Sequence, residues 1–301
     1  MHMTDETSRQ HVLDSYRIVD SLPEDIYQDI VHVAAALCDA PIALLSLVDR
    51  DRQWFKAQLG LGLAQMERSQ AVCDHAIRDP EHLLEVTDLA EDPRFADFSV
   101  VTGDTGARFY AGMPLVTREG VALGTVCVLD TEPRALSEAQ RDGLRALARV
   151  AMRLLDERRR ELQREREAAL RPSAAADARY RVVILEVQEL AALAARQSER
   201  LLGSTLQQLD RTLATYVHNG GHDSVDRVTD SAEFVAMLRG DDAEHKLHGL
   251  REIAERQRAL GLTVLVGAAQ ATQADEPIGQ VFLRAEAALS AEKDRYRQSL
   301  A

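Results

Sequence analysis

The stretch at 137–170 limits the possible folds more than any other part of this sequence, because Gly143 is its only Gly or Pro. Ser137 and Gln140 have the spacing of a capping box, which marks the start of a helix. Apolar residues then recur at roughly heptad intervals before the run becomes strongly charged. A helix of about 33 residues, rising about 1.5 Å per residue, is a rod about 50 Å long. One small domain cannot bury the apolar stripe of such a rod along its whole length, so the sequence predicts a helix that pairs with a second copy.

The composition excludes several classes of protein. A chain of 301 residues has room for two domains with separate cores, and 46% hydrophobic with 28% charged residues is ordinary for globular proteins. The formal charge of −13 argues against nucleic acid and anionic membrane surfaces as partners, because both are bound through clustered cations.

The cysteines and the N-terminus indicate where the protein works. Cys38, Cys73 and Cys127 lie far apart without paired spacing, which is not a disulfide framework and suits a reducing compartment. The first residues are polar, and no run of 18 apolar residues occurs. We therefore expect a cytoplasmic protein.

Residues 1–136 are predicted to form an α+β domain. An apolar helical rhythm occupies 12–37, and two pairs of strand-like segments follow, each joined by a short turn. The pairs are 41–51 with 53–60, and 108–116 with 121–130. Short turns favour antiparallel pairing, so a mainly antiparallel sheet with helices is expected.

Residues 179–301 are predicted to form an α/β domain. The long helix (137–171) and a short linker (172–178) separate it from the first domain. Strands alternate with long helices, which favours this class. The expected order is a strand at 181–187, a helix to about 216, a hairpin over 225–238, a helix at 241–260, a strand at 262–269 and a helix at about 278–297.

Several ordered motifs in the first domain resemble the GAF family. They read PIALLSLVDRDRQWFKAQLGL, VCDHAI, DLAEDPRF, RFYAGMPL and GTVCVLDTEPRAL, and the resemblance covers about residues 12–158. It implies a six-stranded antiparallel sheet with helices on one face and a ligand pocket on the other. GAF domains bind varied small molecules and some only dimerise, so the resemblance leaves the ligand open.

The segments that would cover this sheet contain candidate pocket residues. A pocket needs apolar walls with a few convergent polar groups, and this set offers both. The alternative is that these side chains belong to the core or satisfy buried polar groups. The candidates are Cys73, His75, Asp88, Arg94, Phe109, Tyr110 and Met113.

Cys73 also raises an enzymatic alternative. Some GAF proteins resemble free methionine sulfoxide reductases, which need a nucleophilic thiol and a resolving thiol nearby. Cys127 lies inside an apolar strand and Cys38 at a helix end, so neither lies in the mobile loop that this chemistry requires. We therefore interpret Cys73 as a buried structural thiol.

The second domain resembles the GGDEF family, the diguanylate cyclases, in the order of its elements and in VVILEVQEL, AEFVAML, LTVLVGAA and AEAALSAEKDRYRQ. The resemblance implies a site where carboxylates hold two metal ions that activate GTP. Glu186 occupies the place of the first-strand carboxylate. In the signature loop, Ala232 replaces the second carboxylate, and Asp230 and Ser231 replace the paired glycines.

Other family residues are also missing. The guanine-reading positions fall at Ala194 and Ser204, and the product-inhibition motif reads GGHD at 220–223, without its Arg. Lys293 and Arg297 match the family's phosphate-contacting cations, although cations are also favoured at a helix C-terminus. The vestigial nucleotide site would comprise Glu186, Asp230, Glu233, Lys293 and Arg297.

The sequence thus favours a bacterial signalling protein in which a GAF sensor is coupled to a degenerate, catalytically inactive GGDEF-like module. We expect a homodimer through the GAF domain and the helix at 137–171, a small-molecule ligand of unknown identity and a signalling-protein partner, with no metal or cofactor. A feeble diguanylate cyclase, or another guanine-nucleotide enzyme, using Glu186 with Asp230 or Glu233, is one alternative. A nucleotide receptor that holds phosphate through Lys293 and Arg297 without turnover is another.

Overall fold

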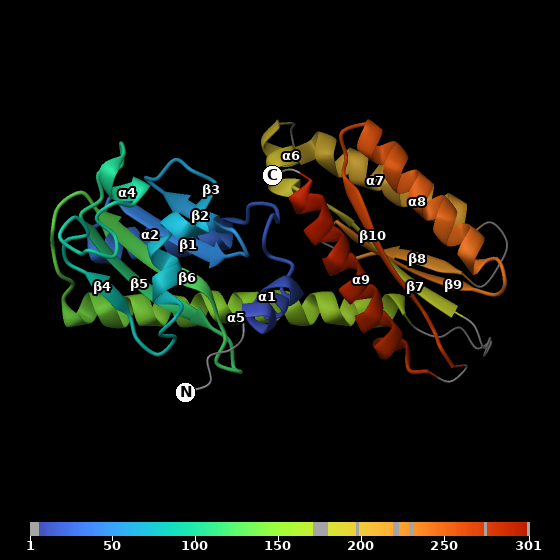
Figure 1. Ribbon diagram of the computed structural model, residues 1–301, viewed down its shortest axis with the longest axis horizontal. Coiled ribbons are helices and arrows are strands. Elements are labelled where there is room, and N and C mark those ends of the chain that lie inside the picture. The colour runs from blue at the N-terminus through green and yellow to red at the C-terminus, as the bar shows by residue number, and fades with distance from the viewer. Residues whose placement is uncertain are drawn as a thin grey trace. The chain divides into compact units, whose positions relative to one another are not determined.

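The computed structural model describes residues 6–170, 180–196, 199–218, 223–228, 232–273 and 276–299. The chain divides into two compact units, residues 1–159 and 160–301 (Figure 1). The expected linker at 172–178 and the turn at 229–231 lie outside the described residues. None of the helices in the described part has the length and apolar character needed to cross a bilayer.

Unit 1 contains a six-stranded sheet in the order β3-β2-β1-β6-β5-β4, and every adjacent pair is antiparallel. Both expected hairpins are confirmed. The strands are β1 (Ile42–Val48), β2 (Arg52–Leu59), β3 (Gln65–Glu67), β4 (Leu84–Val86), β5 (Phe109–Val116) and β6 (Ala122–Asp130). The short helices are α1 (Glu6–Ser15), α2 (Asp25–Cys38), η1 (Arg68–Gln70), α3 (Val72–Ala76) and α4 (Ser99–Thr102).

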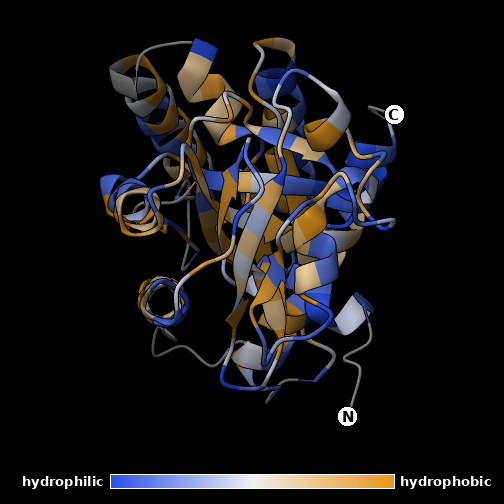
Figure 2. Cartoon of the chain, turned by 90° about the vertical axis from the view of Figure 1, so that its left-hand side faces the viewer, coloured by the Kyte–Doolittle hydropathy of each residue, from blue (hydrophilic) through white to orange (hydrophobic). Residues whose placement is uncertain are grey.

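Both faces of this sheet are covered. All seven residues of β1 are buried, and successive side chains of a strand point to opposite faces. Helix α2 packs against β1, β2 and β6, whereas α3 packs against β1, β5 and β6 and joins a large apolar cluster that includes Phe95 and Leu89. Figure 2 shows hydrophobic residues concentrated on the strands and on the helix sides that meet them.

Helix α5 (Glu138–Ala169) has the expected extent, and its capping box is formed: the Ser137 amide donates to Gln140 Oε1 at 2.9 Å. The helix is divided between the two units rather than standing apart as a separate segment. Leu144 and Leu155 are buried in unit 1, whereas Leu162 and Leu170 belong to the core of unit 2. The early apolar stripe is therefore buried by its own chain, which removes the need for a second copy to cover it.

Unit 2 contains a four-stranded sheet in the order β10-β7-β9-β8. Its elements follow the expected order, which gives the β-α-β-β-α-β pattern of ferredoxin-like folds. The strands are β7 (Tyr180–Val187), β8 (Ser224–Arg227), β9 (Glu233–Arg239) and β10 (Val264–Gln270). The helices are α6 (Leu190–Arg196), α7 (Glu199–Val217), α8 (Ala243–Ala259) and α9 (Ile278–Gln298).

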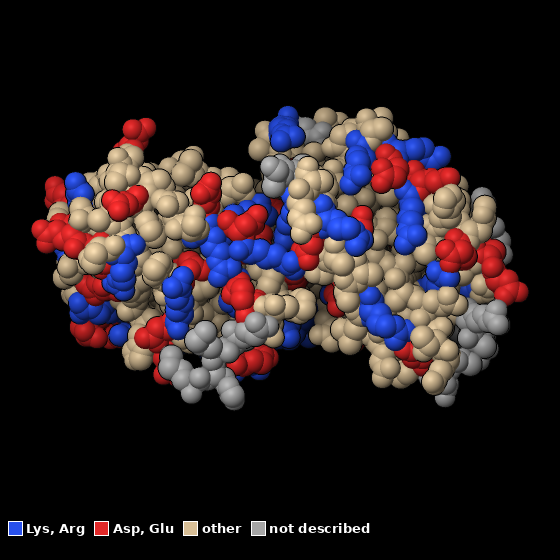
Figure 3. Space-filling view, in the orientation of Figure 1, with Lys and Arg blue, Asp and Glu red and all other residues tan. Residues whose placement is uncertain are grey.

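The expected α/β class is wrong for this unit, because every adjacent pair of strands is antiparallel. The β8–β9 hairpin inserts β9 between β7 and β8, so strands connected through helices are not neighbours. Helix α9 packs on β7 and β10 over one apolar cluster, while α7 and α8 pack on the other side of the sheet (Figure 1). On the face shown in Figure 3, acidic and basic side chains are interspersed over both units.

Candidate functional sites

A buried polar cluster lies on one face of the central strands of unit 1, beneath α3. It is unusual because three of the four strands that contribute to it are almost wholly apolar. Each member is at most 2% exposed. The members are Ser46 on β1, Gln53 on β2, Cys73 on α3, Tyr110 on β5, and Thr125 and Cys127 on β6.

The Cys73 sulfur is the centre of this cluster. It accepts hydrogen bonds from Gln53 Nε2 and Thr125 Oγ1, both at 3.1 Å, and from the Tyr110 hydroxyl at 3.3 Å. The Ser46 hydroxyl lies 3.1 Å from Thr125 Oγ1 and extends the network. The Cys127 sulfur is 3.7 Å from that of Cys73.

The local backbone makes room for this arrangement at Gly112. This residue pairs with Cys127 across β5 and β6 and shares a strand face with Tyr110, two residues away. A Cβ atom at Gly112 would lie 2.1 Å from the Tyr110 hydroxyl oxygen. Glycine therefore allows the tyrosine ring to lie along the strand and its hydroxyl to reach Cys73.

The two thiols of the cluster have opposite electrostatic environments. Burial works to raise the pKa of Cys73, but hydrogen bonds from Cys127, Ser46, Thr125 and Tyr110 outweigh it and lower the pKa to about 6. Burial and the neighbouring Cys73 raise the pKa of Cys127 well above its ordinary value. These opposite shifts favour Cys73 over Cys127 as the thiol that loses its proton first.

The predicted pocket residues do not come together as one group. Cys73 and Tyr110 meet in the polar cluster. His75 instead packs edge-on against Phe95, with ring centroids 4.9 Å apart, and Arg94 lies over the same Phe95 ring at 4.7 Å. His75 is half-buried, and burial together with Arg78 lowers its pKa.

The remaining three predicted pocket residues have separate surroundings. Phe109 is buried under the guanidinium of Arg134, at 5.6 Å, and alternates in direction with Tyr110 along β5. Asp88 accepts a hydrogen bond from the Ala90 amide in a turn. Met113 is partly buried on β5. The prediction missed Ser46, Gln53 and Thr125. Ser46 and Thr125 had a signal, because they are polar side chains inside apolar strands, whereas Gln53 lies in a strand with several polar residues.

In unit 2, two carboxylates lie side by side at one end of the sheet. Glu186 on β7 is the direct cross-strand partner of Glu233 on β9. Like charges directly opposite each other destabilise a sheet. Each of these carboxylates, however, is paired with a cation: Lys293 Nζ on α9 lies 2.6 Å from Glu186 Oε1.

Glu233 is paired with the end of α5. The Arg166 guanidinium donates two parallel hydrogen bonds to Glu233, both 2.7 Å long, and also lies 3.2 Å from Glu286. The side chains of Arg166 and Glu233 are 10% and 2% exposed. The guanidinium also lies over the Phe282 ring at 5.4 Å. This buried bidentate pair was not predicted, because its partners are far apart in sequence.

The other predicted nucleotide-site residues are more scattered. Asp230 lies outside the described residues, and Arg297 lies on the last turn of α9. Asp223, in the segment that was compared with a product-inhibition motif, is buried and accepts hydrogen bonds from Lys246 and from the Arg239 amide. Over the residues that the structure describes, no cluster of three or more His, Cys, Asp or Glu side chains could hold a metal ion.

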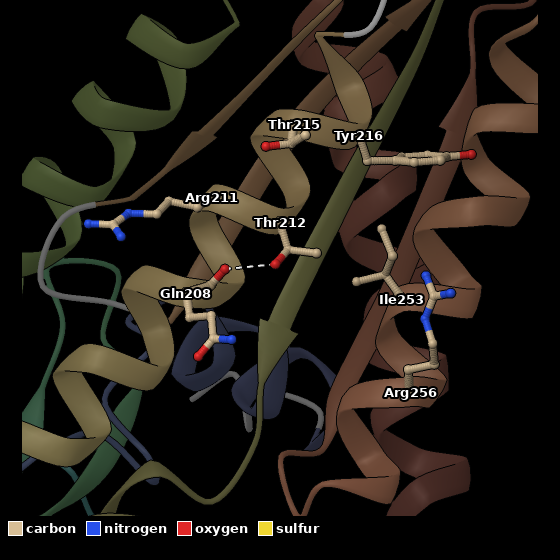
Figure 4. Close-up of a pocket in the computed structure, with 7 residues that line it drawn as sticks. All are labelled: Gln208, Arg211, Thr212, Thr215, Tyr216, Ile253 and Arg256. Carbon is tan, nitrogen blue, oxygen red and sulfur yellow. Dashed lines mark hydrogen bonds between the residues drawn. The ribbon is translucent and has the colours of Figure 1, made fainter.

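A surface groove of about 450 Å³ lies between α7 and α8 (Figure 4). Its lining residues are Gln208, Arg211, Thr212, Thr215, Tyr216, Ile253 and Arg256. The Thr212 hydroxyl donates to the Gln208 carbonyl within its own helix. Because α7 and α8 cover the side of the sheet opposite α9, this groove is separate from the paired carboxylates.

Comparisons with known proteins find matches to the first unit. A family model described as GAF domain matches residues 22–155. A cyclic di-GMP phosphodiesterase of Pseudomonas aeruginosa is 40% identical over 149 residues, which are 49% of this chain and 25% of that protein. The chain therefore spans about a quarter of the length of this curated relative.

Two solved structures also resemble this unit. The GAF domain of an Acinetobacter phosphoenolpyruvate-protein phosphotransferase is 17% identical, covers 52% of this chain and 96% of its own, and has a TM-score of 0.37. The PixJ GAF domain of Thermosynechococcus elongatus is 14% identical, covers 56% and 97%, and has a TM-score of 0.36.

Proposed function

We propose, from the finding that residues 22–155 form a GAF domain, that this chain is a bacterial signalling protein whose second unit acts by contact rather than by catalysis. The second unit would be a GGDEF-like module that has lost its reaction. The relative from Pseudomonas aeruginosa is a cyclic di-GMP phosphodiesterase, which supports a place in signalling by that dinucleotide.

One observation carries the proposal for the second unit: cations of the protein itself hold the carboxylates that a metal ion would need. Glu186 is paired with Lys293, and Glu233 with Arg166. Breaking a buried ion pair by removing one partner costs about 3–5 kcal/mol. A metal ion binding here would have to displace both cations, and Ala232 offers it no oxygen in exchange. A receptor that grips phosphate through Lys293 would likewise have to draw that side chain away from Glu186.

Helix α5 is the natural route for a signal. Its residues up to Arg159 pack in unit 1, and Arg166 on its last turns binds the first residue of β9 in unit 2. A ligand shifts such an element only by its difference in affinity for two packing states. Binding in the GAF domain would therefore act on unit 2 through the position of this helix.

The proposed loss of catalysis is tested with the full chain, GTP and either Mg²⁺ or Mn²⁺. We expect no cyclic dinucleotide by chromatography and mass spectrometry over hours, because the metal ligands are absent or paired. The matched variants are Glu186→Gln in the site and Glu292→Gln on the outer surface of α9. Dinucleotide formation by the wild type and by Glu292→Gln, abolished in Glu186→Gln, would show that the unit is an enzyme.

The expected homodimer has a candidate surface in unit 1. Ile26, Val33 and Leu37 form one stripe along α2 and are 48%, 52% and 38% exposed. Leu37 packs on Gly143 of α5, where an added Cβ would lie 2.2 Å from its Cδ2. Val150, seven residues further along α5, is 45% exposed. We propose that these two helix faces meet the same faces of a second copy.

A further inference from the structure

Two of the three cysteines have their sulfur atoms in van der Waals contact inside the GAF domain. The sulfur atoms of Cys73 and Cys127 are 3.7 Å apart, although 54 residues separate them in sequence. A disulfide needs an S–S distance of about 2.05 Å. Cys38, at the end of α2, is buried outside the apolar cluster that contains Cys73 and Cys127, so it serves as an internal comparison.

The surroundings of Cys73 suit a thiolate better than a thiol. A neutral sulfur is only a weak hydrogen-bond acceptor, yet three donors converge on this one. Gln53 directs its amide nitrogen to the sulfur while its Oε1 atom is buried without a hydrogen-bond partner. Leaving an acceptor unsatisfied is costly. The arrangement is therefore built around negative charge on Cys73.

We propose that Cys73 and Cys127 are a redox-active pair that a small hydroperoxide converts to a reversible disulfide, which gives the GAF domain a second, covalent input. The Cys73 thiolate attacks one peroxide oxygen, the O–O bond breaks, and Cys73 becomes a sulfenic acid. Hydroxide leaves and becomes water by taking up the proton that Cys73 released on ionisation. Cys127 then attacks that sulfur, and water leaves with the Cys127 proton. In total, two thiols lose two electrons and two protons, and hydrogen peroxide is reduced to two molecules of water. A dithiol reductant reverses the bond by thiol–disulfide exchange.

The burial of both sulfurs limits which oxidant can reach them, and their positions in the fold determine which element moves when the bond closes. Both sulfurs are at most 2% exposed, so the reagent has to be small and uncharged, as hydrogen peroxide is. Cys127 lies in the middle of a central strand, whereas Cys73 lies in the five-residue helix α3. Closing the bond would therefore move α3 toward the sheet rather than distort β6.

The test treats the folded full-length protein with hydrogen peroxide, stops the reaction, and counts thiols after unfolding. We expect the count to fall from three to one, with a Cys73–Cys127 linked peptide in the mass spectrum that a dithiol reductant removes. In Cys38→Ser, the count should fall from two to zero. In Cys127→Ser, a sulfenic-acid trap should label Cys73.

Two outcomes would overturn the proposal. One is oxidation that joins Cys38 to either partner in the folded protein. The other is retention of all three thiols in the folded protein at peroxide doses that oxidise the same chain in denaturant. The wild-type measurement needs no substitution in the core, so it stands even where a cysteine variant folds poorly. Oxidised glutathione is the size control, and it should form the Cys73–Cys127 bond far more slowly than peroxide does.

Discussion

At the scale of single residues, Cys73 and Cys127 show how neighbours rather than residue type decide ionisation. Both are buried, and burial raises the pKa of each thiol. Hydrogen bonds lower the pKa of Cys73 to about 6, whereas for Cys127 burial and the neighbouring Cys73 outweigh the hydrogen bonds from Thr125 and Tyr110, so its pKa rises. Hydrogen bonds to the charged form can outweigh desolvation without a cation nearby.

This difference predicts a pH dependence of stability. The folded-state pKa of Cys73, about 6, is below its ordinary value of 9.0, so the unfolded chain binds more protons between these values. The contribution of Cys73 to the free energy of unfolding is complete above pH 9.0 and is lost as the pH falls through about 6. Denaturant titrations should show the difference between wild type and Cys73→Ser growing from pH 6 to 9.

Cys38→Ser is the matched control for this measurement. Burial raises the pKa of Cys38 to about 11, so removing this thiol should leave the slope between pH 6 and 9 unchanged. A difference between wild type and Cys73→Ser that stays constant over the same range would show that Cys73 is protonated in the folded protein.

At the scale of elements, the residues of β5 determine which hydrogen-bond donor can reach the Cys73 thiol. The Tyr110 hydroxyl reaches Cys73 because Gly112, two residues away on the same face, has no side chain in its path. Strand β6 supplies the other side of the cluster through Thr125 and Cys127. The cluster is therefore a property of paired strands rather than of one motif.

Gly112→Ala tests this link. The new Cβ would lie 2.1 Å from the Tyr110 hydroxyl oxygen, so we expect a loss of about 1–3 kcal/mol in the free energy of unfolding, as for overpacked cores. Displacing the tyrosine also removes a donor from Cys73, so the thiolate should appear at higher pH in ultraviolet absorbance. Tyr110→Phe should raise the Cys73 pKa without the steric cost. Gly203→Ala is the control, because an added Cβ there has nothing within 4 Å. A thiolate titration in Gly112→Ala that is unchanged from the wild type would refute the role of this glycine.

At the scale of the whole molecule, α5 belongs to two cores. Leu144 and Leu155 pack in unit 1, and Leu162 and Arg166 are buried in unit 2. Helices α2 and α5 also expose an apolar face, separate from the buried stripe of α5, which includes Val33 and Val150. The proposed dimer depends on that face and not on the stripe that the chain already buries.

Val33→Glu combined with Val150→Glu should convert the dimer to a monomer in light scattering, because both charges would be buried in an apolar interface. Leu260→Glu is the control for an added surface charge, because Leu260 is 79% exposed beyond α8 in unit 2. It should leave the mass unchanged. Equal monomer masses for the wild type and the double variant would remove the proposed dimer.

Most local features of the fold were predictable, because they depend on neighbours in sequence. Alternation and short turns predicted the hairpins at 41–60 and 108–130, and a long stretch whose only Gly or Pro is Gly143 predicted α5. The strand directions in unit 2 were not predictable this way. Alternating helices and strands suggested an α/β class, whereas the hairpin of β8 and β9 places β9 between strands that a helix connects.

By itself, the sequence determined where most helices and strands occur, because periodicity is a property of short segments. Only the tertiary structure decided that Cys73 lies beside Cys127, that Glu186 lies opposite Glu233, and that Lys293 and Arg166 pair with those carboxylates. These contacts depend on strand register and on which helix covers which face. A shift of one residue in register turns a side chain to the other face of its sheet, so no local pattern contains that information.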